Sequence, residues 1–62
     1  MTYQFLLIDT RTGKVLNRRI EVDEVEGGVI GYALSRPGAR VDDRGIWYRA
    51  GIEDACWLVT PA

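Results

Sequence analysis

The sequence predicts an α+β fold, a small two-layer domain in which an antiparallel sheet of four to five strands carries one helix packed on one face. The chain has 62 residues, which is the size of a single domain, residues 1–62. Short segments alternate apolar and polar residues and are joined by turn residues, as in antiparallel strands. One segment in the middle has apolar residues at helical spacing. The predicted order is two strands, the helix, and two or three further strands.

The first two strands are predicted to form a hairpin. Residues 3–8 (YQFLLI) are apolar on both faces, which is typical of a strand in the middle of a sheet. Asp9 favours the start of a turn, and Gly13 can adopt the left-handed conformation that closes a hairpin with a bulge. The return strand, residues 15–22, alternates as a half-buried strand does. Its apolar side carries Leu16, Ile20 and Val22, and its polar side carries Asn17, Arg19 and Glu21.

Residues 24–36 are predicted to form the helix. Asp23 can cap its start, and Glu24 and Glu26 would lie in the first turn, where acidic side chains interact favourably with the helix dipole. The Pro–Gly pair at residues 37–38 is a stop signal. The residues at helical spacing are Val25, Val29, Tyr32, Ala33 and Arg36.

Three glycines leave a second interpretation of this segment open. Gly27, Gly28 and Gly31 would each cost about 1 kcal/mol relative to alanine inside a helix. In the alternative, the first two form a turn and residues 29–35 (VIGYALS) form a strand. The helical spacing and the stop signal favour the helix.

The remaining strands hold both tryptophans and one of the three tyrosines. We expect a short strand at residues 39–43 and longer strands at residues 45–50 and 55–60. Alternation directs Tyr48 to one face of the sheet and Trp47 to the other. Because one helix covers only one face, Trp47 is expected on the uncovered side, beside Arg49.

The sequence predicts no catalytic residues. It has no histidine, the commonest general base near neutral pH. Ser35 is the only serine and has no evident base, and Cys56 is placed in the middle of a strand. We therefore expect a protein that is not an enzyme.

No metal or cofactor site is predicted either. One cysteine without histidine excludes the common zinc sites. The acidic neighbours at residues 42–43 and 53–54 would point to opposite faces of a strand, and neither pair lies in a calcium-loop pattern. The glycines of EGGVIGYA do not follow the G-x-G-x-x-G order of dinucleotide-binding loops.

The sequence indicates a cytoplasmic protein with no membrane partner. No apolar run approaches the roughly 20 residues needed to span a bilayer. The start lacks the basic region and cleavage site of a secretory signal. A single cysteine fits a reducing compartment.

Protein binding is the predicted function. Trp and Arg are enriched among the residues that dominate protein interfaces. Trp47 and Arg49 on the uncovered face, joined by Arg19 from the second strand, form the candidate protein-binding site. A protein partner is expected there or at the sheet edge, and a second copy of the chain, giving a homodimer, is one candidate.

Nucleic-acid binding is the alternative. An aromatic side chain among arginines can stack a base and hold phosphates. The candidate residues for it are Arg11, Lys14, Arg18, Arg19 and Trp47. The net charge of −1 and a pI of about 5.2 count against it, because nucleic-acid binders usually have a basic excess.

The acidic stretch at residues 21–26 is a second candidate surface, directed toward a basic partner. The layout of IDTRTGKVL, RPGARV and GIWYRA resembles small phage-encoded proteins, including some anti-CRISPR proteins that share the size and the order of strands, one helix and further strands. This resemblance implies a stoichiometric inhibitor that binds a host protein machine without chemistry. It includes no motif specific to one family, so it assigns no functional residues.

Overall fold

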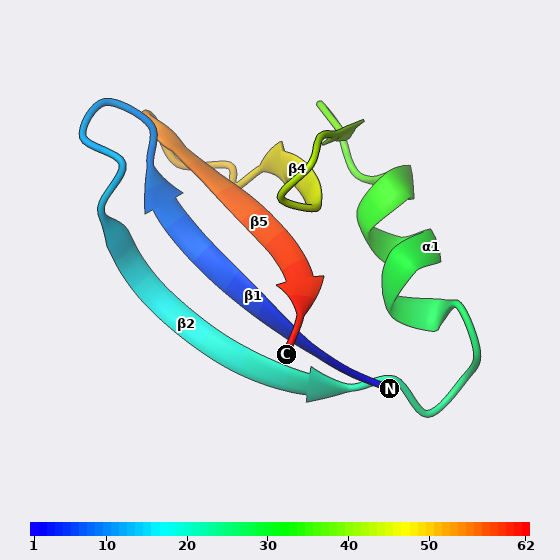
Figure 1. Cartoon of the computed structure of the whole chain (residues 1–62). Helices are drawn as coiled ribbons and strands as arrows, with labels where there is room; N and C mark the ends of the chain where they lie inside the picture. Colours follow the sequence, from blue (N-terminus) through cyan, green and yellow to red (C-terminus); the bar gives the residue numbers. More distant parts are fainter.

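The computed structural model describes all 62 residues and contains one five-stranded antiparallel sheet and one helix (Figure 1). The elements are β1 (Thr2–Asp9), β2 (Val15–Val22), α1 (Gly28–Ser35), β3 (Arg40–Val41), β4 (Ile46–Arg49) and β5 (Ala55–Pro61). The strand order is β2-β1-β5-β4-β3. The α+β class, an antiparallel sheet of the predicted four to five strands and the order of two strands, a helix and further strands are confirmed. No helix is long and apolar enough to cross a membrane.

The opening hairpin forms as predicted. The Gly13 N–H donates to the Asp9 carbonyl at 2.7 Å, and Gly13 has a φ of 77°. The Arg11 N–H donates to Asp9 Oδ1, so the acidic side chain fixes the turn that it begins. A bulge shifts the register between Leu7 and Ile8. β1 lies between β2 and β5, which is the interior position that its two apolar faces predicted.

The helix begins later than predicted. Gly27 precedes it with a φ of 76°, a left-handed conformation that glycine adopts without strain, and no side chain caps it. The Asp23 N–H instead donates to the Met1 carbonyl and continues the β1–β2 ladder. The predicted Asp23 cap is therefore wrong, and the first turn of α1 contains no acidic residue. The segment combines both interpretations: a turn at Gly27, then a helix.

Strand pairing assigns each side chain to one of two sides of the sheet. Phe5 lies opposite Val59, which lies opposite Ile46, so these three share one side. Ala33 of α1 is fully buried in the same hydrophobic cluster, so we call this the α1 side. The core cluster consists of Tyr3, Phe5, Ala33, Ile46, Tyr48 and Val59. The opposite side, which carries Leu6, Trp47 and Leu58, is called the open side.

β2 is an exposed edge strand and not the half-buried strand that its alternation predicted. All eight of its residues are exposed. Its polar residues Arg19 and Glu21 pair with Phe5 and Tyr3 and so lie on the α1 side. Its apolar residues therefore face the open side, where no second layer covers them. Figure 1 shows why the residues of β2 on the α1 side are also exposed. The helix lies toward β4, far from the outer part of β2.

Candidate functional site

Trp47 is a core residue and not part of an exposed surface. It lies on the open side, as alternation predicted, but only 7% of it is exposed. The Arg40 guanidinium lies 4.9 Å from the centre of its ring, and its indole Nε1–H donates to Asp42 Oδ2 at 2.8 Å. The expectation of an exposed Trp47 is therefore wrong, because side chains from β3 and from the turn that follows it pack against the ring.

Asp42 organises this turn between β3 and β4. Its Oδ1 accepts hydrogen bonds from the N–H groups of Arg44 and Gly45 at 2.9 and 3.3 Å. The hydrogen bond from Trp47 is the main reason that the pKa of the Asp42 carboxyl lies below its ordinary value of 3.8. Gly45 has a φ of 151°, and a Cβ there would collide with the Val59 carbonyl oxygen. The turn therefore requires both the acid and the glycine.

The structure does not bring the three predicted protein-binding residues together. Arg19 pairs with Phe5 and lies on the α1 side. Trp47 and Arg49 lie on the open side, because they flank the inward Tyr48 along β4. The prediction that Arg19 joins them on one face is wrong: the register of β1 and β5, which separate the two strands, decides the face, and β2 alone does not reveal it.

The residues of the nucleic-acid alternative are distributed over different parts of the surface. Arg11 lies at the β1–β2 turn with its Nε 3.5 Å from Asp54, and Lys14 lies at the end of the same turn. Arg18 lies on the open side, in the same cross-strand row as Trp47 but with β1 and β5 between them. Two of the five residues, Arg11 and Arg19, are paired with acids. Nucleic-acid binding stays a prediction.

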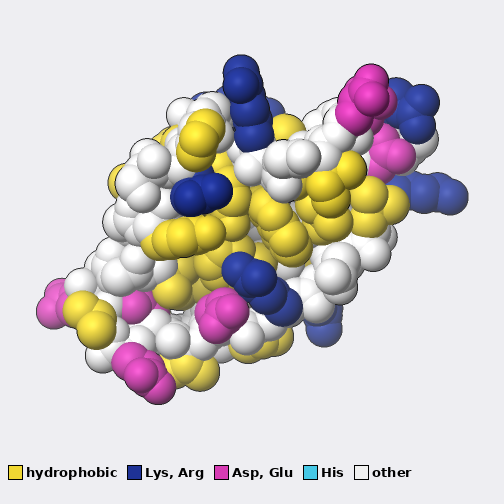
Figure 2. Space-filling model, turned by 180° about the vertical axis from the view of Figure 1, so that it is seen from behind, with side chains coloured by type: hydrophobic (Ala, Val, Ile, Leu, Met, Phe, Trp, Pro, Cys, Tyr) yellow, Lys and Arg dark blue, Asp and Glu magenta, His cyan; other side chains and the backbone are white.

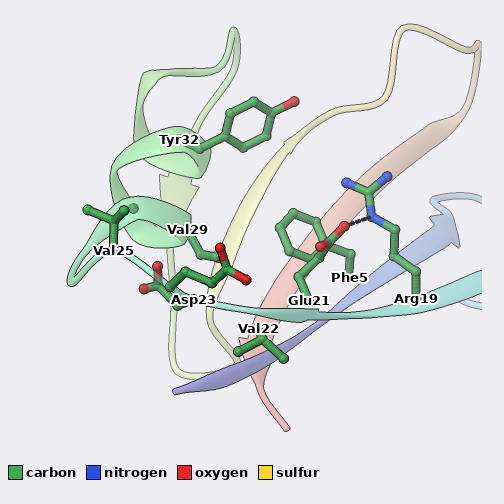
Figure 3. Close-up of a pocket in the computed structure, with 10 residues that line it drawn as sticks. Phe5, Arg19, Glu21, Val22, Asp23, Val25, Val29 and Tyr32 are labelled. Carbon is green, nitrogen blue, oxygen red and sulfur yellow. Dashed lines mark ion pairs between the residues drawn. The ribbon is translucent and has the colours of Figure 1, made fainter.

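A groove on the α1 side, between β2 and α1, is the largest hollow of the surface. It is open to solvent and has a volume of about 530 Å³. We call it the β2–α1 groove. It is lined by Phe5, Arg19, Glu21, Val22, Asp23, Glu24, Val25, Gly28, Val29 and Tyr32. Figure 3 shows Arg19 and Glu21 rising from β2 on one side of it, and Tyr32 and Val29 projecting from α1 on the other.

One aromatic ring of the sheet, Phe5, lines the groove and is covered by one cation. The rings of Phe5 and Trp57 meet edge to face, with their centres 6.4 Å apart. The Arg19 guanidinium lies 4.7 Å from the centre of Phe5 and 5.3 Å from that of Trp57. Its Nε is 3.3 Å from Glu21 Oε1, which holds it in this position (Figure 3). Arg19 thus belongs to a site, but with neighbours other than those predicted.

The rest of the groove combines apolar walls with an acidic end. Val25 and Tyr32 are 72% and 47% exposed. Figure 2 shows apolar side chains gathered in a continuous band across one face of the molecule, with basic and acidic side chains along it. Three carboxylates line the groove against the single guanidinium: Glu21, Asp23 and Glu24. The groove therefore has apolar surface for contact and an excess of negative charge.

The lone cysteine and the lone serine of the chain do not line the groove. Cys56 is half-buried on the open side, opposite Ile8, and Ser35 donates its hydroxyl to the Tyr32 carbonyl at the end of α1. No group of three or more His, Cys, Asp or Glu side chains lies close enough together to hold a metal ion. Apolar contact, hydrogen bonding and charge are what this site offers.

Sequence reasoning identified parts of this groove without joining them. The helical spacing of Val25, Val29 and Tyr32 and the acidic stretch at residues 21–26 were both visible as patterns. Their meeting with Phe5 depends on where α1 lies along the sheet, which is a long-range property. No protein-family model, curated protein or solved structure matches this chain, so its function is inferred from the geometry of its surface.

Proposed function

We propose that this chain is a non-enzymatic protein-binding module that takes a segment of a partner protein into the β2–α1 groove. The observation that carries the proposal is the groove: an open hollow of about 530 Å³ with apolar walls and an acidic end, on a domain of 62 residues. Exposed apolar side chains that line one continuous hollow are typical of interaction sites.

The openness of the groove favours a polypeptide over a small molecule. Small-molecule sites bury most of the ligand's surface within a cavity. Here the two walls come from β2 and α1 and leave the hollow open, so an extended or helical segment can lie along it (Figure 3). Val25 and Tyr32 would contact apolar side chains of that segment.

The charges of the groove indicate which kinds of residue the partner segment contains. Asp23 and Glu24 have no ion pair in the structure, whereas Glu21 is paired with Arg19. Carboxylates without a partner attract Lys and Arg and repel acidic segments, which selects partners and speeds association. The expected segment has two or three apolar residues with a basic residue beside them.

Binding without chemistry is how a stoichiometric inhibitor acts. The resemblance of the sequence layout to small phage-encoded inhibitors is consistent with an inhibitory role, but it does not assign that role to particular residues. In that role the chain would bind a basic and apolar segment of a host protein machine and prevent that segment from binding its own partner.

Selection from a display library of random 12-residue peptides, with the intact chain as bait, tests the proposal. Apolar residues flanked by Lys or Arg should be enriched. Calorimetry with the best peptide should then show at least a tenfold weaker affinity for Tyr32→Ala than for the unchanged chain, which corresponds to about 1.4 kcal/mol.

Leu34→Ala is the matched control. Leu34 lies on the same helix and is 50% exposed, but it does not line the groove. Its substitution should leave the affinity within twofold. No enrichment of any motif, or equal effects of the two substitutions, would exclude the groove as the binding site.

A further inference from the structure

The two edges of the sheet differ greatly in length and protection. β3 at one edge has two residues, whereas β2 at the other has eight, all of them exposed. Figure 1 shows β2 along the outside of the sheet, with β1 on one side of it and no element on the other. A long edge strand without cover is a template for pairing with another strand. Which strand fits it follows from the backbone and charges of β2.

Alternation shows which backbone groups of β2 face the free edge. The Asp23 N–H donates to the Met1 carbonyl, so residue 23 faces β1. In an antiparallel ladder the direction alternates, so Glu21 and Arg19 also face β1. The N–H and C=O groups of Arg18, Ile20 and Val22 therefore point away from the sheet. Of these, only the Arg18 N–H has a partner, the side-chain Oδ1 of its neighbour Asn17.

We propose that a second copy of this chain pairs with this edge, β2 against β2 and antiparallel, with Ile20 on the two-fold axis. In this register Ile20 lies opposite Ile20 of the second copy, and Arg18 lies opposite Val22. These are the residues whose backbone groups face outward, so each pair can exchange both hydrogen bonds. The result is one continuous sheet across both copies and an interface that is the same on both sides.

The charges of β2 select this register over its neighbours. With Ile20 on the axis, Arg19 of each copy lies directly opposite Glu21 of the other, and opposite charges in this position stabilise the pairing. A shift of the axis to residue 19 places Arg19 opposite Arg19 of the second copy, and a shift to residue 21 places Glu21 opposite Glu21 of the second copy. A shift to residue 18 places Arg18 opposite Arg18, and a shift to residue 22 places Glu21 opposite Asp23. Each of these alternatives opposes like charges.

The pairing also extends an interaction that already exists within each chain. Arg19 Nε lies 3.3 Å from Glu21 Oε1 on the α1 side of the same strand. Two copies in the proposed register would form a square of four alternating charges. On the open side, Ile20 and Val22, which are 52% and 64% exposed, would gain apolar contact. The pairing leaves α1 and its side of the β2–α1 groove unobstructed, so this inference does not rest on the proposed function.

Sedimentation of the intact chain over a range from micromolar to millimolar concentration tests the pairing. The weight-average mass should rise with concentration from 7.0 kDa toward twice that value. Arg19→Glu alone and Glu21→Arg alone should each stay at the monomer mass, because each places like charges opposite one another. An equimolar mixture of the two variants should reach twice the monomer mass, because a strand with acids at both positions then pairs with a strand that has bases at both.

Two controls separate the edge from other surfaces. Glu53→Arg changes the same charge in a turn away from β2 and should leave the dimer intact. Ile20→Pro removes an outward N–H while keeping the bonds to β1, and should abolish the dimer with the fold retained. A monomer at every concentration, a dimer that persists in Ile20→Pro, or variants that fail to associate when mixed would overturn the proposal. Arg19 and Glu21 also line the β2–α1 groove, so peptide binding is tested through Tyr32→Ala and the dimer through Ile20→Pro, neither of which changes a residue of the other interaction, and the two proposals can fail separately.

Discussion

At the residue scale, the contact between Trp47 and Asp42 holds the β3 end of the sheet together. The indole N–H donates to one carboxylate oxygen while the other oxygen accepts from the backbone of the turn. Removal of the Asp42 carboxylate would leave the buried indole N–H and the N–H groups of the turn without an acceptor. Removal of Trp47 would leave the Asp42 carboxylate without its side-chain donor. Both side chains should therefore contribute to the stability of the fold.

Trp47→Ala should lower the free energy of unfolding by about 3–5 kcal/mol, the usual loss for a large aromatic core side chain. A chain of this length has a total stability of roughly 3–9 kcal/mol, so the variant should lose at least a third of it. Urea unfolding followed by circular dichroism measures the loss. A loss below about 1 kcal/mol would mean that Trp47 is a surface residue after all.

The pH dependence of stability should contain a contribution from Asp42. Its pKa is lower in the fold than its ordinary value of 3.8, so its ionised form stabilises the folded state. This contribution is fully present above that ordinary value and is lost as the pH falls through the lowered pKa, below about pH 4. Asp42→Asn should therefore have a lower Tm than the unchanged chain at pH 7, and the difference should shrink below pH 4.

Thermal unfolding between pH 7 and pH 2 measures this. Asp43→Asn is the control, because the Asp43 side chain makes no hydrogen bond or ion pair in the structure. A difference in Tm between Asp42→Asn and the unchanged chain that stays constant down to pH 2 would contradict the assignment.

At the scale of elements, two glycines of the α1 region differ in their roles. Gly27 fixes the start through its left-handed conformation, and Gly31 lies inside the helix, where a Cβ would have no other atom within 4 Å. The two glycines look alike in the sequence but have opposite roles: one is required by the backbone conformation, and the other only weakens the helix.

Gly31→Ala should raise the free energy of unfolding by about 0.5–1 kcal/mol, because alanine favours the helix and no neighbour obstructs it. Gly27→Ala should lower it by about 1–2 kcal/mol, because a Cβ is strained in a left-handed conformation. Urea unfolding of both variants measures the two signs. A loss in Gly31→Ala would contradict the open space at Gly31, and no loss in Gly27→Ala would contradict the role of its left-handed conformation.

The sequence predicted the elements well and their surroundings less well. The turn residues Asp9 and Gly13 determine the first hairpin locally, so it was predictable. The face of Trp47 was predicted correctly, but its burial was not, because the cover comes from a turn whose path depends on tertiary packing. Likewise, Arg19 lines the β2–α1 groove, and its aromatic neighbours lie on β1 and β5. The sequence of β2 alone does not specify the register that places them beside it.

At the scale of the whole molecule, the sheet is wider than its single helix can cover. Only nine of the 62 residues are buried, and α1 lies toward β4 (Figure 1). The uncovered part of the α1 side becomes the β2–α1 groove, and β2 remains as a free edge. Both proposed interaction surfaces thus have one origin: one short helix on five strands leaves the outer strands without partners.

The most direct test of the proposed function is a two-dimensional NMR titration of the ¹⁵N-labelled chain with the selected peptide. We predict that the amides that shift most belong to the groove, above all Val25, Gly28, Val29 and Tyr32 of the α1 segment and Val22 of β2. Shifts confined to the open side, around Leu58 and Cys56, would contradict the proposed function and would place binding on the opposite side of the sheet.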